Sequence, residues 1–348
     1  MKGRSAEVAT LARTIEATRP TRIALVGPGG SGKSMLAAAL GHRLSRAFGG
    51  RIDWFRSAAW GYYTLSEMLA LRFGTESGDD RLRRLKQFLA QGPERLIVLD
   101  NHENDRAIQR LFEALSDSNA TFVITARRCL LSGVFIYPVT APLVISGDSA
   151  FPRVASLTRL LRWNPLALDI ADGIVGSRAA SAKSLAAFLQ DAGVTLVRAL
   201  AHEDDLPEIA LLIDWAWPRL SAQSRRALAV LAHIEGDHVD ATSLAKLARV
   251  AKLGPALAGL ERWRLVQQPV RGRYTLHAVV RHAIARRTEP DADRVFSYYV
   301  TLLERHPERL DLEQSHLFAA MDHASRKNDM HAILRVQALA RRLSESRG

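Results

Sequence analysis

The sequence predicts an α/β domain built on a parallel β-sheet, followed by a helical portion that includes a winged helix. Two observations predict this division. Up to about residue 140, short apolar runs typical of strands alternate with amphipathic helical patterns. Apolar strands separated by helices are typical of a parallel sheet that is covered on both faces. Beyond about residue 146, nearly all of the patterns are helical.

The elements of the α/β region follow one another in a regular order. An amphipathic helical pattern over residues 1–15 comes first and differs from the charged head and apolar core of a secretion signal. Strands are predicted at residues 23–26, 52–55, 95–99, 121–125 and 134–139. Helices are predicted at residues 35–48, 65–73, 81–89 and 107–115. A nucleotide bound to such a sheet is expected at the carboxyl ends of its strands.

The helical portion begins with residues 153–175, whose helical apolar spacing is interrupted by Pro165. Proline lacks the backbone N–H and fixes φ, so Pro165 should open or bend a helix. Ser221 is predicted to cap a further amphipathic helix. Helical patterns at residues 241–247 and 254–263 then precede two short β-like runs. Three helices followed by a hairpin predict a winged helix.

Composition limits the classes of function. The chain has 348 residues, 47% of them hydrophobic, without a long uninterrupted apolar run, so we expect a cytoplasmic protein with room for two or three domains that does not bind a membrane. The single cysteine, Cys129, excludes a disulfide framework or a zinc cluster of cysteines. A net charge of +12 is compatible with a nucleic acid partner, an acidic protein partner or a coding bias toward arginine.

The strongest motif lies directly after the first predicted strand. Residues 27–34 match G-x-x-x-x-G-K-[ST] at every position, and the residues are Gly27, Pro28, Gly29, Gly30, Ser31, Gly32, Lys33 and Ser34. The glycines allow backbone N–H groups to face an anion, and the following helix adds the positive end of its dipole. We expect Lys33 to reach the β- and γ-phosphates of a nucleotide and Ser34 to bind Mg²⁺. The alternative is a flexible glycine turn with a chance lysine.

A second phosphate-site element is predicted at the end of the strand at 95–99. Asp100 ends this apolar run and is predicted to hold Mg²⁺ as the Walker B acid; a simple turn aspartate is the alternative. Asn101 follows, where many hydrolytic relatives have a second acid that orients water, and an amide cannot accept a proton at neutral pH. Glu103 is the candidate substitute. Hydrolysis is therefore predicted to be slow.

An arginine ends the next predicted strand. Within Thr125-Ala126-Arg127-Arg128, we expect Arg127 to approach the γ-phosphate and report its presence, because Arg127 lies nearer the strand end than Arg128. An arginine at a strand end is otherwise most often a solvated surface charge.

These motifs, taken in order, resemble the signal-transducing ATPases of the STAND class, most closely the NB-ARC or AP-ATPase branch. The motifs are GRSAE at 3–7, the P-loop, LIVLDNHEN, FVITARR, WNPLAL, the winged helix and YTLH at 274–277. The resemblance implies an α/β P-loop NTPase with a parallel sheet, then an all-α subdomain, a winged-helix domain and a helical C-terminal segment. The implied domains are residues 1–145, 146–205, 206–288 and 289–348, the last one similar to the start of TPR-like repeats.

The resemblance also implies roles for residues outside the P-loop. Pro165 would lie near the adenine, and His277 would contact the β-phosphate of ADP. Gly3, Arg4 and Glu7 match the family's entry motif. Three residues depart from the family pattern, which usually has glycine and leucine before the proline and often has an aspartate after the histidine: Trp163, Asn164 and Ala278.

The implied function is an ATP/ADP-controlled switch. ADP would hold a closed monomer, ATP would open it into a self-associating form, and slow hydrolysis would reset it. ATP or ADP with Mg²⁺ are the expected ligands, with a protein partner as effector or sensor and a homo-oligomer on activation.

Two further hypotheses come from other classes. A DNA-binding ATPase is one, because initiator-type ATPases also join a P-loop domain to a winged helix and basic residues crowd the predicted wing: Arg262, Arg264, Arg271, Arg273, Arg281, Arg286 and Arg287. A small-molecule kinase is the other, but the sequence offers no evident substrate pocket for it.

Overall fold

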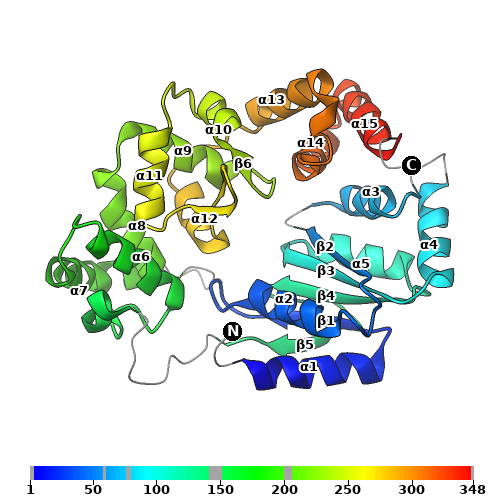
Figure 1. Ribbon diagram of the computed structural model, residues 1–348, viewed down its shortest axis with the longest axis horizontal. Coiled ribbons are helices and arrows are strands. Elements are labelled where there is room, and N and C mark those ends of the chain that lie inside the picture. Colours follow the sequence, from blue (N-terminus) through cyan, green and yellow to red (C-terminus); the bar gives the residue numbers. More distant parts are fainter. Residues whose placement is uncertain (1–3, 58–59, 76–79, 141–150, 200–205, 346–348) are drawn as a thin grey trace. The chain divides into compact units, whose positions relative to one another are not determined.

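The computed structural model describes residues 4–57, 60–75, 80–140, 151–199 and 206–345. Contacts divide the chain into two compact units (Figure 1). The first unit comprises residues 1–27, 32–140 and 296–348, and the second unit comprises residues 28–31 and 141–295. Among the described helices, none combines the length and hydrophobicity that crossing a bilayer requires.

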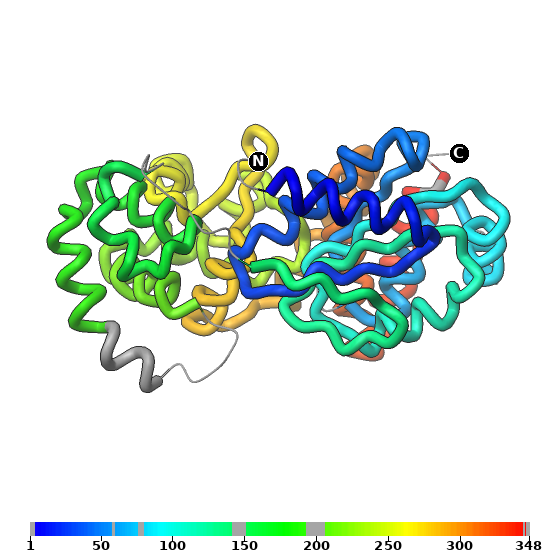
Figure 2. Tube along the Cα trace, turned by 90° about the horizontal axis from the view of Figure 1, so that it is seen from below, coloured from blue at the N-terminus to red at the C-terminus, as the bar shows by residue number. Residues whose placement is uncertain are grey.

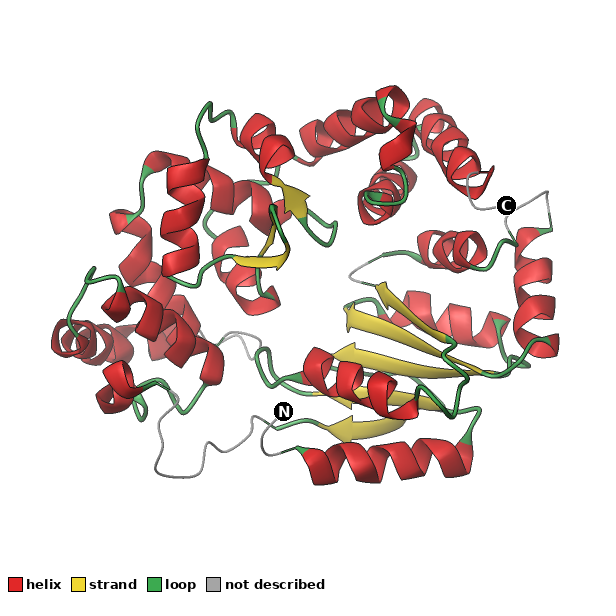
Figure 3. Ribbon diagram, viewed as in Figure 1, coloured by secondary structure: helices red, strands yellow, loops and turns green. Residues whose placement is uncertain are grey.

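The first unit is built on a five-stranded sheet in the order β2-β3-β4-β1-β5 (Figures 1 and 3). The strands are β1 (Arg22–Val26), β2 (Ile52–Arg56), β3 (Arg95–His102), β4 (Ala120–Ala126) and β5 (Phe135–Pro138). All neighbouring strands are parallel. The predicted α/β class is therefore confirmed, and the carboxyl ends of the strands meet at one edge.

Helices of the first unit cover both faces of this sheet (Figure 3). They are α1 (Ser5–Thr18), α2 (Lys33–Leu44), α3 (Tyr62–Arg72), α4 (Arg81–Gln91), α5 (Asp105–Ala114), α13 (Ala292–Arg305), η3 (Pro307–Arg309), α14 (Gln314–Lys327) and α15 (Met330–Glu345). Residues of a strand alternate between faces. In β1, for example, Ile23 and Leu25 pack in one buried cluster and Ala24 in the other.

One face, which we call the α2 face, is closed by α1 and α2. Its cluster contains Leu11 and Ile15 of α1 and Leu36 and Leu40 of α2, all at most 1% exposed. These two helices flank β1 in sequence, so the α2 face is covered by local segments. Burial of this apolar stripe anchors α2, which begins at the glycine-rich loop.

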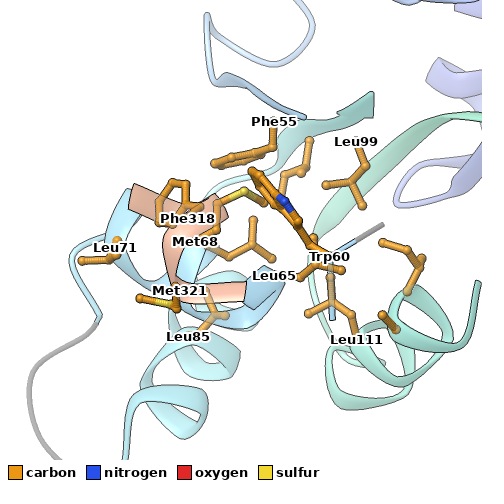
Figure 4. Close-up of a cluster of buried hydrophobic side chains, with 14 of the residues drawn as sticks. Phe55, Trp60, Leu65, Met68, Leu71, Leu85, Leu99, Leu111, Phe318 and Met321 are labelled. Carbon is orange, nitrogen blue, oxygen red and sulfur yellow. The ribbon is translucent and has the colours of Figure 1, made fainter. Parts of the chain in front are cut away.

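The opposite face, which we call the α3 face, is closed by α3, α4 and α5 together with the C-terminal helices. Trp60 and Met68 share one cluster with Phe318 and Met321 of α14 (Figure 4). The indole ring of Trp60 meets the ring of Phe318 edge to face, with centroids 6.1 Å apart. Figures 1 and 2 both show the C-terminal helices beside segments from the first quarter of the chain.

The second unit is mainly helical. Its elements are η1 (Pro152–Leu157), α6 (Pro165–Gly176), α7 (Ala182–Ala199), α8 (Pro207–Ala216), η2 (Trp217–Arg219), α9 (Ala222–His233), β6 (Val239–Asp240), α10 (Ala241–Ala248), α11 (Gly254–Arg262), β7 (Gln267–Val270), β8 (Arg273–Thr275) and α12 (Ala278–Ala285). The predicted helices and hairpin of a winged helix are present, with β6 completing a sheet in the order β6-β8-β7. Ser221 caps α9 by accepting a hydrogen bond from Ser224 N–H, as predicted.

Three local expectations need correction or refinement. Residues 153–163 do not form an α-helix, because η1 is followed by turns in which Arg162 and Trp163 have φ of 49° and 58°. Pro165 opens α6, as predicted. Strand β3 runs beyond Leu99 to His102, since a register shift lets the chain pair again after the apolar run ends. The predicted boundaries at 145/146 and 205/206, and Gly3, lie outside the described residues.

Candidate functional site

The glycine-rich loop joins β1 to the start of α2. Gly27 N–H donates to Ala126 O of β4 at 3.2 Å, which holds the start of the loop at the carboxyl edge of the sheet. Gly30 and Gly32 have φ of 75° and 86°, in the left-handed region that favours glycine. Gly32 is the N-cap of α2 and supplies no capping side chain. No side chain caps the first N–H groups of α2, and uncapped N–H groups at a helix N-terminus are suited to binding an anion.

Lys33, the first residue of α2, curls back onto the loop. Its Nζ donates to Gly27 O at 2.7 Å. Burial, and then the positive charge of Arg127, lower the pKa of Lys33 to about 8, while Asp100 acts in the opposite direction. The structure thus brings Lys33, Arg127 and Asp100 together electrostatically. An incoming polyanion would relieve the mutual repulsion of the two cations.

Asp100 is held by two hydroxyl groups. Its Oδ1 accepts from Ser34 Oγ at 2.7 Å and from Thr125 Oγ1 at 2.6 Å. Thr125 Oγ1 in turn accepts from Asn101 N–H at 2.9 Å. A carboxylate and a hydroxyl are hard oxygen donors of the kind that Mg²⁺ prefers, so Ser34 and Asp100 fit the predicted metal role.

Asn101 and Glu103 interact directly. Asn101 has φ of 55°, which turns the chain after Asp100, and its Nδ2 donates to Glu103 Oε1 at 3.0 Å. Glu103 is exposed. The sequence analysis considered Asn101 and Glu103 separately. The hydrogen bond between them is seen only in the structure.

The two chain segments around this site are linked through His102 and Asp105. His102 is 3% exposed and its Nε2 lies 2.8 Å from Asp105 Oδ1. Burial lowers the pKa of His102. Asp105 Oδ2 accepts from Leu130 N–H, beyond Arg127, at 2.8 Å. This connection ties the loop after β3 to the loop after β4.

Thr125 is a site residue to which the sequence analysis gave no role. A threonine one residue before the last position of a buried strand is weak evidence, because threonine is common in strands. Its role becomes visible only when the pairing of β3 with β4 brings it to Asp100.

Arg4 also reaches the glycine-rich loop. It is 5% exposed, donates to Thr140 O at 2.5 Å and pairs with Glu7 at 3.4 Å. A Cβ built on Gly32 would lie 3.8 Å from Arg4 Nη2. Arg4 of the predicted entry motif therefore lies beside Gly32 of the loop.

Pro165 and His277 both begin helices of the second unit. Pro165 is the first residue of α6, and His277 is the N-cap of α12, where its Nδ1 accepts from Val279 N–H at 3.3 Å. Asn164 caps α6 and also donates to Glu208 Oε1 at 3.1 Å, which explains an amide where the family usually has leucine. Contacts of Pro165 and His277 with a nucleotide remain predictions.

Several arginines of the predicted basic surface are engaged within the second unit. Arg264 pairs with Asp169, and Arg287 pairs with Asp214. Arg273 is 5% exposed and donates to His238, while Arg281 donates to Leu231 O. Arg262, Arg271 and Arg286 are exposed. The charge available to nucleic acid is thus smaller than the sequence count indicates.

Within the described residues, no group of three or more histidine, cysteine, aspartate or glutamate side chains could hold a metal ion.

Comparisons with known proteins support the fold. No protein-family model matches the sequence, and no curated protein matches it. Among solved structures, the chain is similar to a STAND protein with a tetratricopeptide repeat sensor, PH0952 from Pyrococcus horikoshii, at 15% identity and a TM-score of 0.56. That match covers 99% of this chain and 53% of the Pyrococcus chain, so this chain spans about half the length of that protein.

Other matches are more distant. The ORC1 protein of Aeropyrum pernix, solved in complex with DNA, is 15% identical over 82% of this chain and 93% of that chain, with a TM-score of 0.34. Cdc6p of Pyrobaculum aerophilum is 11% identical over 83% and 95%, with a TM-score of 0.33. At these identities the likeness concerns the fold alone. The chain has an α/β P-loop ATPase fold followed by a mainly helical part.

Proposed function

We propose that this protein binds ATP and ADP with Mg²⁺ and acts as a nucleotide-controlled switch of the STAND type, in the NB-ARC or AP-ATPase branch. The observation that carries the proposal is the convergence of Ser34, Asp100 and Thr125 beside Lys33. Ser34 and Lys33 belong to the P-loop motif, and Asp100 and Thr125 lie near the carboxyl ends of neighbouring strands, so motif and geometry agree. The similarity to the Pyrococcus STAND protein adds support at the level of the fold.

Each part of the site has a distinct role in this proposal. The loop from Gly27 to Ser34 would bind the phosphates through its N–H groups, and Lys33 would add a positive charge. Bound Mg²⁺, held by Ser34 and Asp100, would neutralise phosphate charge. Arg127 would sense the γ-phosphate.

Slow hydrolysis fits the surroundings of Glu103. Glu103 is the candidate general base, but the Asn101 amide holds one of its oxygens at 3.0 Å. The oxygen that accepts this hydrogen bond is less available to position an attacking water. The protein would therefore hydrolyse ATP slowly, so the ATP-bound state of the switch would persist.

In this proposal the nucleotide controls assembly. ADP would hold a closed monomer through His277 and Pro165, and ATP would favour an open form that self-associates and engages an effector or sensor protein. A cytoplasmic location is part of the same proposal.

The test is the identity of the nucleotide released when freshly purified protein is denatured. We expect ADP from the wild-type protein and none from Lys33→Ala. Protein that carries no nucleotide and takes up neither ATP nor ADP in the presence of Mg²⁺ would contradict the proposal.

A DNA-binding ATPase is the second candidate, and the exposed Arg271 at the turn of the β7–β8 hairpin is the observation that favours it. Binding through phosphate contacts would weaken steeply as salt increases. Fluorescence anisotropy with duplex DNA at two salt concentrations, with Arg271→Ala as the variant, tests this candidate. Absence of binding at low salt removes it.

A further inference from the structure

The N-terminus of α3 is capped by a residue that lies far away in the sequence. Gly61 is the N-cap position and offers no side chain. Instead, Asp322 of α14 accepts at Oδ1 from Gly61 N–H at 2.9 Å and from Thr64 Oγ1 at 3.1 Å. Its Oδ2 pairs with Arg326 Nε at 3.0 Å.

Asp322 is only 3% exposed, so its contacts matter energetically. A buried carboxylate is strongly destabilising unless hydrogen bonds and a charge partner compensate for lost water. The two donors on α3 and the Arg326 guanidinium provide this compensation. The positive end of the α3 dipole adds further stabilisation of the negative charge.

Hydrogen bonds connect the capped end of α3 to Asp100, the proposed Walker B aspartate. Ser57 N–H donates to Asp100 O at 2.9 Å, and Trp60 N–H donates to Ser57 O at 3.2 Å. Trp60 O accepts from Nδ2 of Asn104 at 3.3 Å. Asn104 itself caps α5, just after Glu103. Ser57 is thus held at Asp100, Trp60 at Asn104 and Gly61 at Asp322.

Apolar packing strengthens the same connection. Trp60 is 2% exposed and packs edge to face on Phe318, one helical turn before Asp322 (Figure 4). Tyr63 Oη accepts from Gln337 Nε2 of α15 at 3.0 Å. The C-terminal helices therefore hold both the backbone and the side chains at the start of α3.

We propose that Asp322 is a positioning residue for the nucleotide site. By capping α3 at Gly61, Asp322 holds the adjoining Trp60, which contacts Asn104 and Ser57, and Ser57 in turn contacts Asp100. Docking of α14 and binding of Mg²⁺–nucleotide therefore stabilise each other. This inference rests on the proposed nucleotide binding. Coupling of two sites is reciprocal, so each event must favour the other by the same factor.

The first test compares two aspartate variants on the same helical hairpin. Asp322→Ala removes the cap of α3. Asp329→Ala is the matched control, because Asp329 is exposed and its Oδ1 caps α15 rather than α3, accepting from Ala332 N–H at 3.0 Å. We expect Asp322→Ala to speed release of a fluorescent ADP analogue in Mg²⁺ by about fivefold or more, a typical coupling factor, and Asp329→Ala to leave release unchanged. Asp322→Asn keeps an acceptor oxygen for Gly61 N–H and should restore much of the wild-type rate.

The second test uses the wild-type protein, so it does not depend on how a variant folds. Amide hydrogen exchange is measured with and without Mg²⁺–ADP. We expect ADP to slow exchange in residues 60–66 and also in residues 315–327 of α14. Unchanged exchange in α14 while ADP is bound would overturn the inference.

The two proposals fail in different ways. Wild-type protein that binds ADP no better than Lys33→Ala contradicts the proposed function and the inference with it. Binding that depends on Lys33, together with equal ADP release from Asp322→Ala and Asp329→Ala, leaves the proposed function standing and overturns the inference alone.

Discussion

The two faces of the central sheet are covered in different ways. The α2 face is closed by α1 and α2, which immediately flank β1 in sequence. The α3 face is closed by α3, α4 and α5 but also by α14 and α15, more than 250 residues beyond the start of α3 (Gly61 to Asp322 is a separation of 261). The difference indicates that the glycine-rich loop is positioned by local segments, whereas the packing around β3 on the α3 face also involves distant helices.

The largest effect should come from weakening the distant support. Phe318→Ala deletes a ring that is 5% exposed and contacts Trp60. We expect about 3–5 kcal/mol of lost stability, the usual range for a buried phenylalanine. Urea unfolding measures this loss. Leu312→Ala is the control, because Leu312 is 52% exposed and should have little effect. Equal stability of the two variants would show that the α3 face does not need the C-terminal helices.

Lys33→Ala tests the α2 face. Loss of the ammonium group removes charge-assisted hydrogen bonds to phosphate, so we expect about a 100-fold loss of nucleotide affinity, equivalent to about 2.7 kcal/mol. Isothermal titration calorimetry with ADP measures it. Lys86→Ala changes an exposed lysine on α4 and should bind ADP as the wild type does. A similar loss in both variants would mean that the P-loop is not the site.

Asp100→Asn tests a residue of β3, a strand of the sheet that separates the two faces. The amide can still accept from Ser34 and Thr125, but it loses the charge that favours Mg²⁺. We expect affinity for ADP in the presence of Mg²⁺ to fall by about tenfold to thirtyfold, and affinity without Mg²⁺ to change little. Titrations with Mg²⁺ and with a chelator separate the two. An equal loss in both conditions would assign Asp100 a role in folding rather than in metal binding.

The pH dependence of binding should report Lys33. Its pKa of about 8 in the free protein is lowered from 10.5 by burial and by Arg127, and a bound phosphate should raise it again. Free protein above pH 8 must therefore take up a proton when it binds, so affinity should fall by up to about tenfold per pH unit above pH 8. Calorimetry in buffers of different ionisation enthalpy would measure the uptake. Lys33→Arg should lack this dependence, and its persistence there would contradict the assignment.

The smallest effect should come from releasing Glu103. Asn101→Gly removes the amide while tolerating φ of 55° at this position. We expect the rate of ATP hydrolysis to rise by about threefold to tenfold, in the range of a modest general-base effect. Release of phosphate measures the rate. The double variant with Glu103→Gln should lose the gain, and an unchanged gain would exclude Glu103 as the base.

The difference between the faces also explains how much the sequence could predict. The glycine-rich loop, Asp100 and Arg127 come directly after apolar runs in the sequence, so local pattern was sufficient to propose them, and the structure places Asp100 and Arg127 close enough to Lys33 to shift its pKa. Thr125 became a site residue only through the pairing of β3 with β4. The start of α3 at Tyr62 rather than Leu65 could not be predicted, because its capping group is Asp322 and an N-cap is normally sought within the neighbouring residues.

The mainly helical part shows the same limit. The opening of α6 at Pro165 follows from proline chemistry and was predicted. The left-handed conformations of Arg162 and Trp163 were not, because neither residue type favours positive φ and only the surrounding contacts can impose it.

The most direct test of the switch is the mass and shape of the protein in solution in two nucleotide states. Light scattering and small-angle X-ray scattering would compare protein saturated with Mg²⁺–ADP and protein saturated with Mg²⁺ and a nonhydrolysable ATP analogue. We expect a monomer with ADP and a larger or more open form with the analogue. Identical mass and identical radius of gyration in the two states would contradict a nucleotide-controlled switch.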